Sequence, residues 1–392
     1  MSNEEKKEEP LVENPPAPGE ASKKTIILYY GLTVGAVLLV VVIVFIIAVK
    51  LGGNPKSDNS FILKYTSEEN AKVKLFKSEL KDLISTLKID NKEEKISDEF
   101  TFTKKGEHTV EVTLKNALDS MENLFKDCTN LIEVDLSQVD TKNVKSMSNM
   151  FSGCSELAKV DLSKLDISNV ESMDNMFSSC LKLKSLDFKN FKTEKVKDMN
   201  HMFYQCNSLV ELDLSSFKTS SVTNMGSMFD SCRELKKINL KSFDTTNVVD
   251  MNSMFATLPS LETIDLSSFD TKKVENMNKM FLGCTSLKEL DLSKFDTSSL
   301  KDMSSMFYEC KTITSLELKN FNTDNVTKMA AAFAKCEKLS NIDISNFSSK
   351  SLDDNNNNIF QDVAESGKIN FDSSKFDEKY LADSPVENWE KA

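Results

Sequence analysis

Cysteine is the first residue type here whose spacing could carry chemistry, because all eight copies fall in one column of a 26-residue repeat. An even number of cysteines suggests disulfides in a surface protein. Equivalent atoms of stacked units, however, point the same way and lie about 5 Å apart or more, whereas a disulfide joins converging Cβ atoms about 3.8 Å apart. Leu258 replaces cysteine in one unit. We therefore predict buried free thiols at Cys128, Cys154, Cys180, Cys206, Cys232, Cys284, Cys310 and Cys336.

A second column is acidic and lies in the middle of each predicted strand. Carboxylates stacked about 5 Å apart repel each neighbour by roughly 1 kcal/mol in water, so something should offset the repulsion. One interpretation is a strip for cations or for a basic partner. The other is a structural ladder, in which hydroxyls such as Ser137 and Ser163 or backbone N–H groups solvate the carboxylates, and we favour it. The column comprises Asp135, Asp161, Asp187, Asp213, Asn239, Asp265, Asp291, Glu317 and Asp343.

The position two residues before this acid varies more in type and charge, so it is the better source of ligand specificity. It holds Glu133, Lys159, Ser185, Glu211, Lys237, Thr263, Glu289, Ser315 and Asn341. The predicted ligand face therefore combines the two columns at Lys159, Glu211, Lys237, Glu289, Asp161, Asp187, Asp213, Asp265 and Asp291.

Methionines such as Met147 and Met150 could suggest a soft-metal ladder, but phenylalanine shares their face, which is typical of a core. No Cys/His cluster has zinc spacing. Only His108 and His201 are histidines, and no phosphate-cradling loop motif occurs. The net charge of -12 and the single arginine, Arg233, oppose nucleic-acid binding. The sequence predicts no enzyme, no metal and no cofactor.

The elements that must position these columns repeat without insertion or deletion. Phenylalanine recurs every 26 residues from Phe125 to Phe333, in nine Met-x-x-Met-Phe-x-x-Cys blocks with minor substitutions. One unit, Leu157 to Cys180, begins with Val160-Asp-Leu, whose alternation is typical of a short strand. Its Met–Phe block follows helical spacing. The prediction is an α/β repeat: a leucine-rich-repeat-like solenoid of nine strand-turn-helix units.

Two of the repeated segments read VDLSKLDISNVESMDNMFSSC and LDLSKFDTSSLKDMSSMFYEC. They resemble the bacterial surface-protein 26-residue repeat, close to the BspA-like leucine-rich repeats. The resemblance covers about residues 118–352. It implies a solenoid displayed at a cell surface and used for adhesion or recognition. Members of this family commonly carry a cleaved signal or a lipid-modified cysteine near the N-terminus. This chain departs there, because its first cysteine is Cys128.

Attachment is predicted instead from residues 25–49, an uncharged apolar run that as a helix would span about 37 Å, enough to cross a bilayer. Lysines flank both ends, so the positive-inside rule discriminates little. An uncleaved anchor after a short polar tail favours a cytoplasmic N-terminus and an external repeat array. Gly31 and Gly35 form a G-x-x-x-G pair, read either as a homodimer contact or as tolerated small residues, and we favour the latter.

The remaining segments complete the predicted organisation. Residues 1–24 are a polar, disordered tail and 50–60 a spacer. Residues 61–117 form an N-terminal cap, with a helix along the apolar stripe from Val73 to Leu87 and a hairpin over residues 100–114. Residues 118–352 are the solenoid, and 353–392 are a degenerate repeat with a frayed acidic tail. Two glycosylation sequons, at Asn325 and Asn346, arise easily by chance in a chain so rich in Asn, Ser and Thr.

The predicted function is adhesion or recognition of an unknown protein or glycan at the cell surface through the strand face. The alternatives are a membrane-tethered intracellular scaffold and an architectural component of a cell coat. A regular wall of repeats offers many similar weak sites rather than one catalytic hollow.

Overall fold

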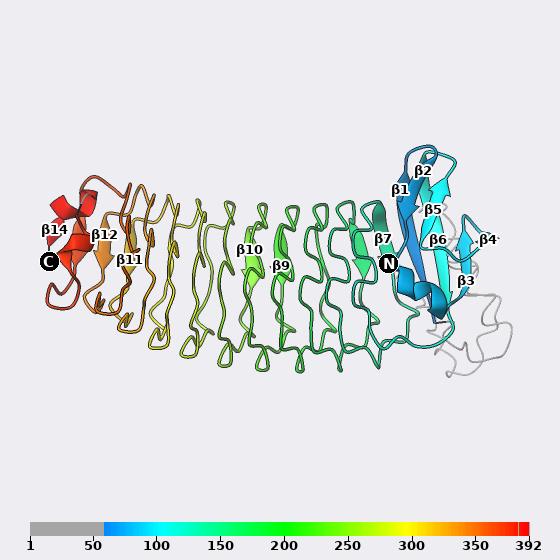
Figure 1. Cartoon of the computed structure of the whole chain (residues 1–392), viewed down its shortest axis with the longest axis horizontal. Coiled ribbons are helices and arrows are strands. Elements are labelled where there is room, and N and C mark those ends of the chain that lie inside the picture. The colour runs from blue at the N-terminus through cyan, green and yellow to red at the C-terminus, as the bar shows by residue number, and fades with distance from the viewer. Residues whose placement is uncertain (1–58, 383, 392) are drawn as a thin grey trace, which may run out of the picture. The chain divides into compact units, whose positions relative to one another are not determined.

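The computed structural model describes residues 59–382 and 384–391, all of which belong to one compact unit. Figure 1 shows that this unit is a stack of coils between a β-rich cap and the C-terminal end. Ten phenylalanines mark ten coils: Phe125, Phe151, Phe177, Phe203, Phe229, Phe255, Phe281, Phe307, Phe333 and Phe360. The chain is therefore a β-solenoid, with one coil more than the nine predicted units.

Each coil contributes one short strand position to the same side of the stack. Strands β7 (Leu131–Asp135) and β8 (Lys159–Asp161) pair in parallel, as do β9 (Glu211–Asp213) and β10 (Lys237–Asn239). Near the C-terminus, β11 (Ser315–Glu317), β12 (Asn341–Asp343), β13 (Lys368–Asn370) and β14 (Glu390–Lys391) form a four-stranded parallel sheet.

The short helix predicted in each unit is wrong. The Met–Phe block is a run of turns, and its alternate N–H groups donate to the next coil: Met147 to the Ser172 carbonyl at 3.0 Å and Phe151 to the Met176 carbonyl at 2.9 Å. An α-helix would direct these N–H groups to carbonyls four residues earlier in the same segment. We call this run, residues 146–153 and its copies, the turn ladder.

Positive φ angles explain why the turn ladder cannot be a helix. Two positions per coil are left-handed, for example Asn149 at 54° and Gly153 at 77°. A left-handed residue reverses the local twist, so a right-handed helix cannot pass through it. Asn, Ser and Gly tolerate this conformation, and they fill many of these positions.

Aromatic and hydroxyl ladders fill the interior. The ring centroids of Phe177 and Phe203 are 5.9 Å apart with almost parallel planes. Thr193 is fully buried, yet its Oγ1 donates to the Lys218 carbonyl at 2.9 Å and accepts from the N–H of the same residue at 2.8 Å. A buried hydroxyl satisfied in both directions fixes the spacing between coils without leaving a polar group unpaired.

The two phenylalanine columns differ in spacing. Neighbouring rings of the column beside the turn ladder lie 5.3–5.9 Å apart from Phe151 to Phe333. Rings of the column that follows the strand position, including Phe191 and Phe217, lie 6.3–6.5 Å apart. The stack is therefore tighter along the turn ladder.

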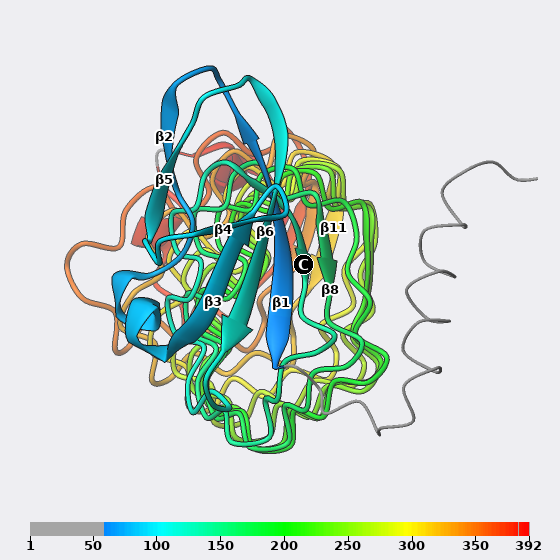
Figure 2. The ribbon, with the colours of Figure 1, turned by 90° about the vertical axis from the view of Figure 1, so that its right-hand side faces the viewer.

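The N-terminal cap is a β-sheet. Its strands are β1 (Ser60–Ser67), β2 (Ala71–Lys74), β3 (Ile84–Ile89), β4 (Lys92–Glu94), β5 (Glu99–Phe102) and β6 (Gly106–Leu114). The main sheet runs β4-β3-β6-β1-β7-β8, so β1 joins the cap to the first coil by antiparallel pairing with β7. Figure 2 looks along the stack and shows β3, β6 and β1 side by side before the coils.

Two predictions for the cap are wrong. The helix expected from Val73 to Leu87 is strand β2, a 3₁₀ turn (Ser78–Leu83) and strand β3. The hairpin expected from residues 100–114 does not form, because β5 pairs with β2 while β6 pairs with β1 and β3. Apolar spacing identified most of the buried side chains here, although Leu83 is exposed, but the strand partners depend on long-range pairing.

The last coil departs slightly from the repeat register. Its aromatic position is Phe360, whose ring stacks on Phe333, although the strict repeat would place Ile359 there. The turn ladder still continues across this step, since the Phe333 N–H donates to the Ile359 carbonyl at 2.9 Å. One extra residue is therefore absorbed without breaking the stack.

The C-terminal end is ordered rather than frayed. The acidic tail covers the last coil with two 3₁₀ turns, Glu378–Tyr380 and Pro385–Asn388. Trp389 is buried, and its Nε1–H donates to the Ala364 carbonyl at 3.0 Å. The tail predicted to fray thus closes the open end of the core.

The tail at 1–24, the membrane span at 25–49 with Gly31 and Gly35, and most of the spacer at 50–60 lie outside the described residues. Among residues 59–382 and 384–391, no helix is long and apolar enough to cross a membrane.

Candidate functional site: the strand face

The nine residues predicted as a ligand face are all exposed on the side of the solenoid that carries the strand positions, which we call the strand face. Lys159 and Asp161 lie on β8, Glu211 and Asp213 on β9, and Lys237 on β10. The others lie on coils without an assigned strand: Asp187, Asp265, Glu289 and Asp291. Because successive side chains of a strand alternate in direction, the two predicted columns flank a central apolar column.

The row of paired strands along the strand face is interrupted in the middle of the molecule. Within the described part of the chain, the positions 185–187, 263–265 and 289–291 carry no strand, so β9 and β10 form an isolated pair, labelled in Figure 1. By contrast, the turn ladder carries bridges in every coil from Ser146 to Lys328. The coils are thus held together continuously at the turn ladder and only in places at the strand face.

Side-chain contacts coincide with the paired strands. Glu133 on β7 meets Lys159 on β8 at 2.6 Å, and Glu211 on β9 meets Lys237 on β10 at 2.9 Å. On β11 and β12, the Asn341 amide donates to a serine hydroxyl at 3.1 Å. Cross-strand pairs of this kind stabilise a sheet by a few tenths of a kcal/mol to about 1 kcal/mol. Contacts within the variable column thus accompany the strand pairs β7–β8, β9–β10 and β11–β12.

Side chains of the central apolar column are fully buried near the ends of the stack, and most of them are only partly buried in the middle. Val134, Leu316 and Ile342 are 1 % exposed. The equivalent residues of the middle coils are only partly buried, apart from Leu212: they are Val160, Leu186, Ile238, Ile264 and Leu290. These partly buried positions include all three interruptions of the row of paired strands.

An open groove of about 590 Å³ lies over β9 and β10. Its floor consists of Leu186, Leu212, Ile238 and Ile264, with Leu240 beside them. Its rim contains four of the predicted residues, Glu211, Asp213, Lys237 and Asp265, together with Lys236, Asn239, Lys241 and Thr263. Lys159, Asp161, Asp187, Glu289 and Asp291 do not line it. The groove is the candidate site.

The acidic column is used by the fold. Asp213 Oδ1 accepts from the N–H of Ser215 at 3.0 Å and from the Asn239 amide at 2.9 Å. The backbone N–H of Ser215 holds the pKa of Asp213 below its usual value, and that of Ser163 does the same for Asp161. These contacts match the structural ladder that we favoured from the sequence.

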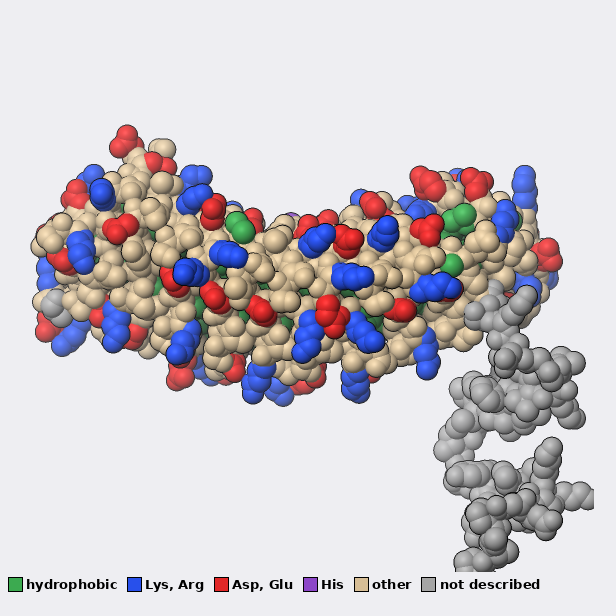
Figure 3. Space-filling view, turned by 90° about the horizontal axis from the view of Figure 1, so that it is seen from below, with side chains coloured by type: hydrophobic (Ala, Val, Ile, Leu, Met, Phe, Trp, Pro, Cys, Tyr) green, Lys and Arg blue, Asp and Glu red, His purple; other side chains and the backbone are tan. Residues whose placement is uncertain are grey.

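Lysine and glutamate also pair between equivalent positions elsewhere on the solenoid. Lys301 meets Glu275 of the preceding coil at 2.7 Å. Figure 3 shows basic and acidic side chains intermingled along one side of the stack. Exposed pairs of this kind contribute little to stability. Their effect is that neither sign of charge dominates the surface.

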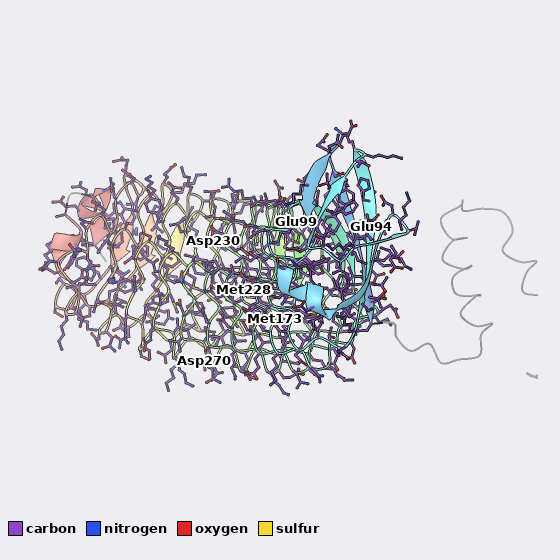
Figure 4. The ribbon with its side chains drawn as sticks, turned by 45° about the vertical axis from the view of Figure 1, so that its right-hand side comes forward. Glu94, Glu99, Met173, Met228, Asp230 and Asp270 are labelled. Carbon is purple, nitrogen blue, oxygen red and sulfur yellow. The ribbon has the colours of Figure 1, made fainter. Side chains whose placement is uncertain are left out.

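The turn ladder presents a different surface, on which the sequence singled out no binding residue. Figure 4 labels Met228, which is fully buried, and Asp230 of the same coil. Burial raises the pKa of Asp230, and the Ser231 hydroxyl donates to its carboxylate at 2.9 Å. The His201 ring packs edge-on against Tyr204, with centroids 5.2 Å apart. No residue pattern marks these groups for a defined ligand.

The cysteine column is a set of free, buried thiols, as predicted. The Sγ of Cys206 donates to the Phe177 carbonyl at 3.1 Å, and the equivalent bond recurs in six other coils. Burial raises the pKa of Cys232 and Cys284 to about 12. A thiol that stays protonated and covered is a core residue rather than a nucleophile.

His108 belongs to the cap and has a structural place. Its ring stacks on Phe102 with centroids 4.1 Å apart, its Nδ1 lies 2.7 Å from an Asp90 carboxylate oxygen, and its Nε2 lies 3.0 Å from the Lys104 carbonyl. These contacts tie the turn at Asp90 to strand β6. Within residues 59–382 and 384–391, no group of three or more His, Cys, Asp or Glu side chains is placed to hold a metal ion.

The floor residues of the groove were missed by sequence reasoning. In the sequence, the pattern at Leu186, Ile238 and Ile264 is that of ordinary inward-facing strand residues. Their residue types do not distinguish them from Leu316, which is buried. The neighbouring variable column gives no signal either: Ile238 is only partly buried beside the Glu211–Lys237 pair, whereas Leu316 is buried beside Ser315.

This repeat architecture agrees with a comparison against known families. The model described as "Mycoplasma protein of unknown function, DUF285" matches residues 119–237, 203–314 and 286–386, which together cover more than half of the chain. The chain belongs to this family. No curated protein matches it.

Among solved structures, the chain is similar to the one titled "Crystal structure of TLR13-ssRNA13 complex", with 15% sequence identity and a TM-score of 0.20. The match covers 63% of this chain and 44% of that one, so this chain spans less than half of that protein's length. A superposition this poor carries no argument about ligands.

Proposed function

We propose that this protein is a membrane-anchored, cell-surface binding protein that recognises a partner, a protein or a glycan, through the strand face. The observation that carries the proposal is the groove over β9 and β10, where partly buried residues of the central apolar column form the floor of a hollow open to solvent. Exposed apolar surface rimmed by polar groups is typical of interaction sites. The resemblance of the repeat to BspA-like surface proteins supports adhesion or recognition as the purpose.

The proposed role is binding rather than catalysis, with no cofactor. Around the groove, Glu211 pairs with Lys237, and Asp213 accepts hydrogen bonds from Ser215 and Asn239. The hydrogen bonds to Asp213 hold the pKa of its carboxylate below the usual value, whereas a general acid or base needs a pKa near the working pH. The net charge of -12 makes nucleic acid an unfavourable partner.

Surface display rests on the apolar run at 25–49, which is long enough to anchor the chain, and on the resemblance of the repeat to BspA-like surface proteins. The proposed orientation has a cytoplasmic N-terminus and an external solenoid. Protease shaving of intact cells that express the full chain with a C-terminal tag tests it. We expect the tagged array to be digested while a cytoplasmic marker stays whole. An array that survives until lysis would refute surface display and favour the intracellular scaffold.

The role of the groove is tested by screening the full chain, in lipid nanodiscs, against immobilised surface proteins and glycans. Glu211→Lys should weaken binding of any partner found at least tenfold, because two lysines would then face each other and open β9 from β10. Glu275→Lys, which breaks the matched pair with Lys301 on another column, is the control and should leave binding unchanged. Equal loss in both variants would place the site elsewhere.

A further inference from the structure

We propose that the groove over β9 and β10 takes an extended, uncharged apolar peptide segment of a partner protein, running along the axis of the solenoid. This inference rests on the proposed function and specifies the partner's chemistry. It follows from the charge of the rim, the width of the floor and the confinement of the partly buried positions of the central apolar column to the middle coils.

The rim offers no net charge to a partner. Three lysines, Lys236, Lys237 and Lys241, stand beside three acids, Glu211, Asp213 and Asp265. Lys237 meets Glu211 at 2.9 Å, and Asp265 accepts from the N–H of Ser267 at 3.1 Å. A ligand with a net charge of either sign would meet equal numbers of like and opposite charges along this rim. A neutral ligand loses nothing at the rim and gains contact with the floor.

The floor is one side chain wide in each coil. Leu212 and Ile238 lie between rim residues one position before and one position after them, and two residues along a strand span about 6.6–6.8 Å. A helix with its side chains is about 10–12 Å across, too wide to enter between the two rims. An extended chain presents a single row of side chains at alternate residues and can lay that row on the floor.

The floor runs across four successive coils, from Leu186 to Ile264, so the long dimension of the groove follows the stack. Outside the middle coils the same column is sealed, as at Val134 and Leu316. The binding surface is therefore short: four coils about 4.8 Å apart span roughly 14 Å, and alternate residues of an extended guest lie about 6.6–6.8 Å apart, which leaves room for about three of its side chains. The guest is thus a segment with a few alternate apolar residues rather than a long repeat.

The test uses the full chain in nanodiscs and fluorescent, end-blocked octapeptides. One peptide alternates Val and Thr, and a second alternates Lys and Thr. The third is lengthened to about 20 residues of Ala and Leu, so that it is long enough to be helical. We expect the Val-Thr peptide to bind best, with less than a twofold change in affinity between low and high salt. Preferred, salt-sensitive binding of the Lys-Thr peptide, preferred binding of the helical one, or no binding of any would overturn the inference.

Variants locate the site. Ile264→Gln, in the floor, should weaken binding of the Val-Thr peptide at least tenfold, whereas Val160→Gln, in the same column but outside the groove, should not. Thr263→Trp changes an exposed rim residue and should block the groove without touching the core. Unchanged binding in the Trp variant would refute the location. Peptide binding does not depend on membrane orientation, so failure here leaves the shaving result standing.

Discussion

At the scale of single residues, the buried polar side chains of the cysteine and threonine columns find their hydrogen-bond partners in a neighbouring coil. The thiol of Cys206 reaches the Phe177 carbonyl, and the hydroxyl of Thr193 both donates to and accepts from Lys218. The same residue type therefore recurs at equivalent positions of successive coils, because its hydrogen-bond partner also recurs in every coil. The energetic consequence is that a substitution in a column leaves a neighbouring coil unsatisfied, at about 1–3 kcal/mol for each buried group.

Thiol reactivity tests this arrangement. With pKa values of about 12 for Cys128, Cys232, Cys284 and Cys336, only roughly one thiol in ten thousand is ionised at pH 8, and all eight are covered. We expect iodoacetamide at pH 8 to leave the native protein unmodified and to add eight labels in guanidinium chloride, as counted by intact mass. Rapid labelling of the native protein would contradict the buried column.

At the scale of elements, the turn ladder replaces the predicted helix. Helix and ladder share apolar positions three and four residues apart, so the pattern of Met, Met, Phe and Cys fits both. They differ in the carbonyl groups that accept from the backbone N–H groups and in the sign of φ. At Lys279, for example, φ is 58°. Hydrogen bonds to neighbouring coils make each ladder segment stable only within the stack.

Glycine substitution distinguishes the two structures. Lys279→Gly should leave the free energy of unfolding unchanged or raise it by about 1 kcal/mol, because glycine adopts positive φ without steric cost. Lys279→Val should lower it by about 1–2 kcal/mol. In an α-helix, the glycine variant would instead lose about 1 kcal/mol. Urea denaturation measures the change.

The matched control for this pair is Lys272→Gly, at an exposed position without a positive φ. It should lose about 0.5–1 kcal/mol through the greater freedom of the unfolded chain. A loss of similar size in Lys279→Gly would argue against the left-handed ladder.

At the scale of the whole molecule, the solenoid is a row of coils closed by dissimilar ends. Strand β1 covers the first coil through β7, and Trp389 with its neighbours covers the last. A coil contacts only its neighbours, so stability should be distributed along the row rather than concentrated in one core.

Truncation of two phenylalanines tests that distribution. Phe203→Ala removes a ring stacked on Phe177 and Phe229 and should cost about 3–5 kcal/mol, with faster hydrogen exchange in the coils on both sides. Phe360→Ala removes a ring stacked on Phe333 alone in the last coil, and it should cost less and loosen only the C-terminal coils. Hydrogen exchange with mass spectrometry measures the change in amide protection in both variants. Uniform loss of protection in either variant would indicate one cooperative globule.

The sequence by itself determined the repeat length, the stacking of similar units, the columns of core residues and the absence of disulfides. These follow from composition and spacing, since apolar side chains at a fixed period can be buried only against their copies. Even the exposed columns around Asp161 and Lys159 were assigned to the right side of each strand position.

Only the tertiary structure decided that the Met–Phe block is a ladder and that the strand face opens over Ile238 and Ile264. The reason is the same in both cases. A backbone N–H group of the Met–Phe block can donate either to a carbonyl in its own segment or to one in the next coil. The exposure of a floor residue depends on how closely two coils approach. Both are set by contacts between coils, such as Glu211 with Lys237, that no single repeat contains.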